Sequence, residues 1–284
     1  MSIIGNFTFS RYWKEAIYLR YPESDILKLN SLLFAKVGAE YRCHHFFKFH
    51  LDLQDYNEIL NQINNGIKLR FNYVDESLYN ALKNWSEKEK KSLKIIDSWD
   101  SPKLKLNSSI EDHLLFNCGK QTTRNYKKYK KNSFNFQYLD SKNFSPEILW
   151  KDVLLIDVNS WKFRENSDMK SLNREDLQYQ QFLINERENT FLNVLYQDNI
   201  PLAYSLFFRN SVTKQWYAVK WGASDLGRKY YAGLFCLYNH LEKLEKIEQR
   251  IDLDFWGRRN ATYDLLKNYS EKRYHILISK EGEL

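Results

Sequence analysis

The chain has 284 residues, of which 43% are hydrophobic and 28% charged, and it carries a formal net charge of +7. This composition excludes a disordered chain, and no apolar run approaches membrane-spanning length. Three widely spaced cysteines without a CxxC pair argue against a disulfide framework and a cysteine zinc site; they are Cys43, Cys118 and Cys236. The N-terminus lacks the apolar region of a signal peptide. We therefore expect a cytoplasmic protein whose positive charge favours anionic partners.

The first part of the chain predicts a β-α-β-α-β order. Strands are expected over 43–51, 67–74 and 93–97. Helices are expected over 55–63 and 76–91. Asp75 is the expected N-cap of the second helix, and Trp99-Asp100-Ser101-Pro102 predicts a turn into a short strand at 104–106. This order favours a mixed sheet covered by helices.

The second part predicts helices first and then a series of strands. Helices are expected over 108–116, 120–131, 146–161 and 174–188, and Ser109 with Asp112 fits a capping box at the start of the first. Strands joined by short connections are expected over 191–196, 200–208 and 215–223, which is typical of an antiparallel meander. A loop at 224–233 then leads to a helix at 234–249. The last elements expected are a strand at 251–255, a helix at 260–268 and a strand at 273–278.

Five cations fall on one face of the helix expected over 120–131, because spacings of three and four residues return to the same side of a helix. They are Lys120, Arg124, Lys127, Lys128 and Lys131. Tyr126 and Tyr129 lie between them. A basic face of this kind binds nucleic acid or an acidic protein, or it is simply solvated, and the sequence leaves these alternatives open.

The loop before the helix at 234–249 is the most informative segment of the chain. Backbone N–H groups at a helix start are unpaired and carry the positive end of the helix dipole, so a pyrophosphate can bind there. Gly233 permits close backbone approach, Ala232 before it is a further expected carrier-binding position, and Arg228 and Lys229 add positive charge. The segment predicts a phosphate site, although the same residues also suit an ordinary loop and cap.

Five short segments follow one another in an order that a known family shares. They are SWDSPKLKL (98–106), GKQTTRNYKKYKK (119–131), VNSWKFREN (158–166), NIPLAYSLFF (199–208) and RIDLDFWGRRNATYDLLK (250–267). With these segments the region 99–269 resembles the BioF2-like, CelD-type acyltransferases of the GNAT (Gcn5-related N-acetyltransferase) superfamily, which are relatives of the FemX aminoacyl transferases. The chain departs from the family pattern at three places: Tyr231-Ala232-Gly233 replaces Ser-Pro-Gly, Tyr263-Asp264 replaces Tyr-Lys, and Val158-Asn159 stands where an acid is expected.

The resemblance implies an α/β (α+β) protein of two GNAT-like halves, with mixed, mostly antiparallel sheets flanked by helices. The expected bounds are 1–107 for a degenerate N-terminal half and 108–284 for the acyltransferase half. The resemblance also implies an N-acyltransferase of the EC 2.3.1 class, which moves an acyl group from acyl-CoA or an acyl-carrier protein to an amine without a metal.

Transfer from a thioester to an amine needs a neutral amine, hydrogen-bond donors for the oxyanion and a proton for the leaving thiolate. Asp254 is the favoured base, because it ends an expected central strand and ligands bind at such ends. Asp252 lies two residues earlier and shares its face of the strand. A structural salt bridge from one of these aspartates to Arg258 or Arg259 is an alternative of equal weight.

The other site residues follow from the resemblance. Tyr231 or Tyr263 would protonate the thiolate. Backbone N–H groups between Val219 and Trp221 would bind the oxyanion, since GNAT folds place this role on the strand before the phosphate loop. Substrate-binding side chains are expected at Trp161, Lys162 and Arg124, with an ordinary solvated lysine as the alternative for Lys162.

Several interpretations stay open at this point. FemX-like relatives use aminoacyl-tRNA, so tRNA is an alternative donor. An aromatic share of 16% suits a long acyl chain, and the acceptor would then be a Lys or ornithine side chain of a peptide. A non-catalytic thioester-binding module is a further alternative. His44, His45 and His50 cluster without a supporting carboxylate or Cys, so we expect strand histidines there rather than metal ligands.

Overall fold

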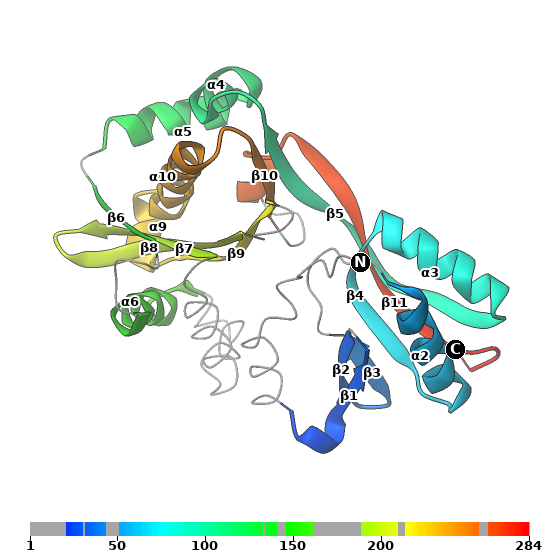
Figure 1. Ribbon diagram of the computed structural model, residues 1–284. Coiled ribbons are helices and arrows are strands. Elements are labelled where there is room, and N and C mark those ends of the chain that lie inside the picture. The colour runs from blue at the N-terminus through cyan, green and yellow to red at the C-terminus, as the bar shows by residue number, and fades with distance from the viewer. Residues whose placement is uncertain are drawn as a thin grey trace. The chain divides into compact units, whose positions relative to one another are not determined.

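The computed structural model describes residues 21–30, 32–43, 51–132, 134–140, 146–161, 189–209, 214–255 and 261–283. The chain divides into two compact units (Figure 1): Met1–Ser101 with Glu271–Leu284, and Pro102–Ser270. Two strands pass along the chain from one unit to the other, β5 (Lys91–Leu106) and β11 (Tyr269–Lys280). The division into GNAT-like halves at 107/108 stays a prediction.

The first unit is a sheet covered by two helices. Its strands are β1 (Ile26–Leu29), β2 (Leu32–Val37), β3 (Glu40–Cys43) and β4 (Leu69–Asp75), followed in the sheet by β11, and a 3-10 helix, η2 (Glu23–Asp25), precedes them. Pairing is antiparallel except between β3 and β4. The helices are α2 (Leu53–Asn64) and α3 (Glu76–Lys88). Phe34 and Phe71 meet edge-on in its core, with ring centroids 5.3 Å apart.

Short-range hydrogen bonds fix the helices of the first unit where the sequence predicts them. Asp52 and Asp55 form a reciprocal capping box at the start of α2. The Asp75 carboxylate accepts from the N–H of Leu78 at 2.8 Å and begins α3. The predicted helices and the strand at 67–74 are confirmed. Of the strand predicted at 43–51, Cys43 ends β3, and 44–50, with the three histidines, lie outside the described residues.

The second unit is a sheet in the order β5, β10, β9, β8, β7, β6. Its strands besides β5 are β6 (Asn135–Asp140), β7 (Thr190–Gln197), β8 (Ile200–Arg209), β9 (Trp216–Ala223) and β10 (Ile251–Asp254). β7, β8 and β9 form the predicted antiparallel meander, and β6, which was not predicted, pairs antiparallel with β7. Asp198 and Asn199 both have positive φ, 50° and 63°, as a two-residue hairpin turn between twisted strands requires. The fold class, a mixed and mostly antiparallel sheet flanked by helices, is confirmed.

Helices cover both faces of this sheet (Figure 1). α5 (Lys120–Lys130) and α10 (Ala232–Ile247) pack on one face, and α6 (Pro146–Val158) lies on the other. The core under α10 contains Trp216, Phe207 and Tyr238, all fully buried. His240 also lies in it, stacked on Phe207 and 2.8 Å from the Ser205 hydroxyl. Burial lowers the pKa of His240 to about 3, so this histidine is a neutral packing residue.

Short helices complete the second unit: α4 (Ile110–Asp112), the π-helical turn η3 (His113–Asn117), α9 (Asp225–Lys229) and α11 (Ala261–Asp264). The Ser109 hydroxyl caps α4 through the N–H of Asp112, as predicted. α9 corrects the prediction of a loop over 224–233. The Ser224 hydroxyl accepts from the N–H of Gly227 at 3.1 Å and so starts a helical turn there. The predicted helix at 174–188 lies outside the described residues.

The turn predicted at 99–102 is wrong, because β5 runs from Lys91 to Leu106 without a break. Proline has a fixed φ that suits an extended backbone. The ladder between β5 and β10 begins at Lys103, so the missing N–H of Pro102 removes no bond to β10. Its carbonyl still accepts from the N–H of Phe255 at 3.1 Å. Among the described helices, none is both long and apolar enough to cross a membrane.

Candidate active site

The parallel strands β9 and β10 separate at the centre of the second unit. Their pairing consists of Leu253 with Trp216 and Asp254 with Tyr217. β10 ends at Asp254, and the next N–H, that of Phe255, donates to β5 instead of β9. β9 continues to Ala223. In the part of the chain that the structure describes, β10 therefore leaves the edge of β9 uncovered beyond Tyr217.

A β-bulge lies in β9 at the point of separation. Leu206 of β8 pairs with Lys220 and Phe207 pairs with Ala218, so Val219 is an extra residue in the ladder. A bulge bends its strand and redirects the side chains that follow. Trp221 packs beside the core under α10, whereas Lys220 bonds to a residue of α6 on the other face. The bulge thus falls within the segment predicted to bind the oxyanion, Val219 to Trp221.

The start of α10 lies directly against the end of β9. A Cβ atom on Gly233 would come within 3.1 Å of the Trp221 ring and 3.3 Å of the Ala223 Cβ atom, so glycine permits this close approach. Tyr231 precedes the helix in the left-handed conformation, with φ of 59°, and its side chain makes no capping hydrogen bond. The first backbone bond of the helix runs from the N–H of Phe235 to the Tyr231 carbonyl.

The free amides of this helix start can hold an anion. Within the described residues, no protein group accepts from the N–H groups of Ala232, Gly233 and Leu234. No side chain caps them, and the helix dipole adds positive potential at the same place. The predicted positions 232 and 233 therefore have the backbone geometry of a phosphate site.

Exposed aromatic and basic side chains surround the helix start. The Arg228 guanidinium lies 5.8 Å from the centre of the Trp161 ring, so the structure brings together two residues that the sequence analysis predicted separately. The Tyr231 ring is 49% exposed, and the Lys128 ammonium lies 5.2 Å from its centre. Lys229 is exposed on α9. Lys162 lies outside the described residues.

Asp254 is buried and paired with a lysine. Its carboxylate lies 3.4 Å from the Lys103 ammonium, its cross-strand partner on β5, and the two side chains are 1% and 6% exposed. Lys103 is one partner of Asp254, and Arg258 and Arg259, the partners considered from the sequence, lie outside the described residues. Asp252 is more accessible and accepts from the Tyr269 hydroxyl at 3.3 Å.

Tyr263 lies in the core of the second unit, close to the end of β9. Its ring stacks on Phe255, with centroids 4.6 Å apart, and lies 5.9 Å from the Trp221 ring. Burial raises the pKa of Tyr263, although a hydrogen bond with Trp221 acts in the opposite direction. The phenol therefore keeps its proton at neutral pH. Tyr231 is the more accessible of the two predicted tyrosines.

One cluster beside the bulge was missed in the sequence analysis. Asp157 of α6 is 3% exposed, and its carboxylate accepts from the Tyr204 hydroxyl at 2.9 Å and from the Lys220 ammonium at 2.6 Å. Gly222 leaves room for it, because a Cβ atom there would lie 3.0 Å from the carboxylate. The signal was adjacent in the sequence: the family pattern expects an acid at Val158, and Asp157 supplies one a residue earlier.

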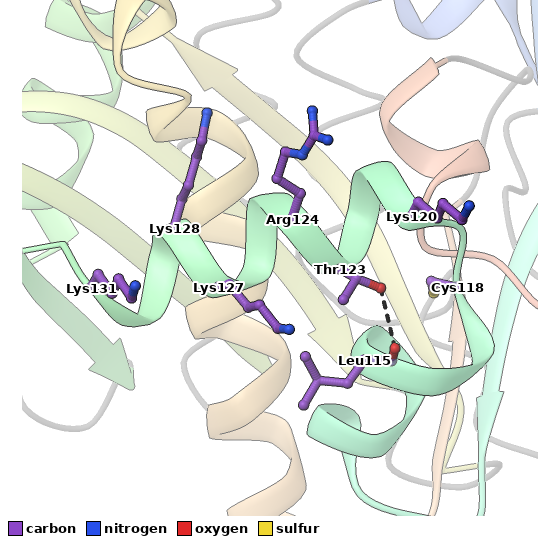
Figure 2. Close-up of a pocket in the computed structure, with 8 residues that line it drawn as sticks. All are labelled: Leu115, Cys118, Lys120, Thr123, Arg124, Lys127, Lys128 and Lys131. Atoms are coloured by element: carbon purple, nitrogen blue, oxygen red, sulfur yellow. Dashed lines mark hydrogen bonds between the residues drawn. The ribbon is translucent and has the colours of Figure 1, made fainter.

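The five cations predicted to share a face of α5 line one groove of about 590 Å³, together with Leu115, Cys118 and Thr123 (Figure 2). We call this the basic groove. The opposite face of α5 packs on α10, where the Tyr126 and Tyr129 hydroxyls both donate to Glu242 at 2.7 Å. Lys130 pairs with the same carboxylate. In the described part of the chain, none of the five groove cations has a carboxylate partner.

The described residues contain no group of three or more His, Cys, Asp or Glu side chains that could hold a metal ion. The candidate site offers hydrogen-bond donors, carboxylates and tyrosines. These lie around the separation of β9 and β10.

Solved structures share this fold. FemX superposes over 96% of this chain and 92% of its own, with a TM-score of 0.60 and 9% identity. L-PGS from Bacillus licheniformis covers 89% of this chain and 81% of its own, with a TM-score of 0.57 and 11% identity. A tandem GNAT protein from the clavulanic acid biosynthesis pathway covers 94% and 87%, with a TM-score of 0.53 and 9% identity. The chain therefore has a GNAT-like fold. No family model and no curated protein matches its sequence.

Proposed function

We propose that the protein is an N-acyltransferase that moves an acyl group from a phosphopantetheine thioester, of acyl-CoA or an acyl-carrier protein, to an amine. The separation of β9 and β10 at a β-bulge, next to the uncapped start of α10, carries the proposal. A thioester needs a slot with backbone donors, and its carrier needs a phosphate site. The fold supports both within one region of the second unit.

In this proposal the donor lies across the helix start and along β9. The amides of Ala232 and Gly233 bind phosphate oxygens, and Arg228 adds a charged donor. The thioester carbonyl points to the N–H groups between Val219 and Trp221, which stabilise the oxyanion as it forms. These donors are fixed by the sheet and the helix before substrate arrives, so little reorganisation accompanies the reaction.

The transfer step requires no covalent intermediate on the protein. The amine nitrogen attacks the carbonyl carbon, the C–N bond forms and the C–S bond breaks. Asp254 takes one proton from the bound ammonium before the attack. A tyrosine, Tyr231 or Tyr263, then protonates the thiolate and regains a proton from the nitrogen, which loses its second proton as the amide forms. Asp252 and Trp161 line the acceptor side of this arrangement, with Lys162 and Arg124 as further substrate contacts. Fatty acyl transfer to a Lys or ornithine side chain of a peptide is the finer form of the proposal.

Aminoacyl transfer from tRNA is the second candidate function. The observation that favours it is the set of cations that line the basic groove, which have no carboxylate partner among the described residues, because such a set neutralises a phosphodiester backbone. A non-catalytic module that binds thioesters without turnover is the remaining alternative. The three candidates differ in the donor they retain and in whether the donor is consumed.

Native mass spectrometry of the protein purified from cells tests the donor directly. We expect a retained acyl-CoA, and we expect thiol release when an acyl-CoA is mixed with lysine- or ornithine-bearing peptides. Arg228→Ala should raise the KM for acyl-CoA roughly tenfold, equivalent to about 1.4 kcal/mol, whereas Lys36→Ala on β2 in the first unit should not. If the protein binds the thioester but releases no thiol with any amine tested, it is the non-catalytic binding module. If the protein neither binds a thioester nor releases a thiol from it, the proposal is overturned.

A further inference from the structure

The basic groove combines a cationic rim with an apolar floor. Leu115, Cys118 and Thr123 form the floor, and Figure 2 shows the Thr123 hydroxyl turned back to the Leu115 carbonyl, 3.2 Å away. Burial raises the pKa of the Cys118 thiol to about 11, so the thiol stays uncharged at neutral pH. A merely solvated basic face needs no such floor. The groove therefore fits a partner that presents both acidic and apolar groups.

These lining residues favour a protein helix over a nucleic acid. Bases that leave a stack are held on aromatic rings, and none of the described residues that line the groove is aromatic. An amphipathic helix instead places apolar side chains in a groove and charged ones along its rim. The cations recur along α5 at helical spacing, so a second helix with acids at spacings of three and four matches them.

The groove is continuous with the helix start that holds the phosphate in the proposed function. Lys128 lines the groove, and its ammonium also lies 5.2 Å from the centre of the Tyr231 ring, directly before α10. Glu242 ties α5 to α10 through Tyr126 and Tyr129. A partner bound on α5 is therefore held at a fixed position relative to the start of α10 and the uncovered edge of β9.

We infer that the basic groove is the docking surface for an acyl-carrier protein, which lays an acidic helix along α5 and delivers its phosphopantetheine thioester past Tyr231. The inference rests on the proposed function and deepens it, because it names the partner that brings the donor. Free acyl-CoA carries the same thioester arm without the acidic helix. The two donors therefore differ in their dependence on the groove.

Charge reversal in the groove separates the two donors. The probe is a purified bacterial fatty-acid acyl-carrier protein loaded with a lauroyl thioester, compared with lauroyl-CoA. Lys120→Glu combined with Lys127→Glu should raise the KM and the Kd for the carrier roughly tenfold, and it should change the KM for lauroyl-CoA less than about twofold. Lys36→Glu with Lys83→Glu in the first unit makes the same change in net charge and should leave both donors unaffected.

Each other outcome overturns the inference. Equal increases for both donors would assign the groove to the nucleotide of CoA. No change for the carrier would make it a solvated face. Tight binding of labelled tRNA with a steep salt dependence, lost in the double variant while the carrier does not bind, would make the partner RNA. Kd values from fluorescence anisotropy need no turnover, so a failure of the proposed transfer and a failure of docking are distinguishable.

Discussion

Asp254 and Lys103 face each other across the ladder of β5 and β10, and both are almost completely withdrawn from water. The desolvation of two charges offsets much of their attraction, so a buried pair is weak evidence for stability alone. This pair lies at the residue where β10 stops pairing with β9. Its place in the fold suits a carboxylate kept ready for proton transfer in the proposed reaction.

Asp254→Asn should abolish acyl transfer and also lower the free energy of unfolding. Removal of one partner from a buried pair costs about 3–5 kcal/mol, because the other charge stays buried. Urea denaturation measures the stability, and thiol release from acyl-CoA measures the transfer.

Asp254→Asn combined with Lys103→Gln separates the two effects. The double variant removes both charges of this pair, so it should be more stable than Asp254→Asn alone. If Asp254 is the base, transfer stays absent. Recovery of transfer along with stability would make the pair structural and remove Asp254 from the mechanism.

For individual residues, the sequence identifies candidate functional side chains but not which of them are in contact. Lys103 was not identified as the partner of Asp254, because the register of a strand pair about 150 residues apart in the chain depends on the whole sheet. The cluster of Asp157, Tyr204 and Lys220 was missed for the same reason. Arg228 and Trp161 were both predicted from local patterns, and their contact follows from the fold.

At the scale of helices and strands, the contact between α5 and α10 centres on one carboxylate, that of Glu242. Glu242 accepts from two tyrosine hydroxyls and pairs with Lys130. Burial alone would raise the pKa of Glu242, but the hydrogen bonds from Lys130, Tyr126 and Tyr129 outweigh it and lower the pKa below its ordinary value of 4.5. The folded state therefore favours the ionised carboxylate more than the unfolded state does.

The sign of the resulting pH dependence follows from this lowered pKa. The stabilisation is fully present above about pH 4.5 and is lost as the pH falls through the folded-state pKa. Glu242→Gln should lower the free energy of unfolding at neutral pH by about 1.5–3 kcal/mol and flatten its decline below pH 4.5. Urea denaturation across this range measures both. Glu87→Gln on the exposed face of α3 is the control, and an equal effect there would contradict the assignment.

Local patterns predicted the elements better than their boundaries. Three strand-like segments joined by short connections identified the meander of β7, β8 and β9. The short helix α9 was not predicted within the loop before α10, although Ser224 followed by Asp225 is a typical helix N-terminus. The bulge at Val219 left no trace in the sequence, because it depends on how β8 and β9 are paired.

The charge of the whole chain bears on how the donor arrives. The net charge is +7, and Arg228 and Lys229 lie on α9, directly before the start of α10. The positive field of these charges speeds the approach of an anion and is screened over about 10 Å at 0.1 M salt. The kcat/KM for lauroyl-CoA should therefore fall as sodium chloride is added. A lauroyl thioester of N-acetylcysteamine has no phosphate, and its kcat/KM should stay constant; a parallel fall would point to a general effect of salt on the enzyme.

The first unit is assembled from two distant pieces of the chain, and this matters during synthesis on the ribosome. β4 pairs with β11, where Asp75 meets Arg273, and all of Pro102–Ser270 is translated between them. In the nascent chain, one edge of β4 therefore stays unpaired until the entire second unit has been synthesised. An unpaired strand edge can form hydrogen bonds with non-native strands. The edge of β4 that pairs with β11 is therefore open to non-native pairing until the last part of the chain is made.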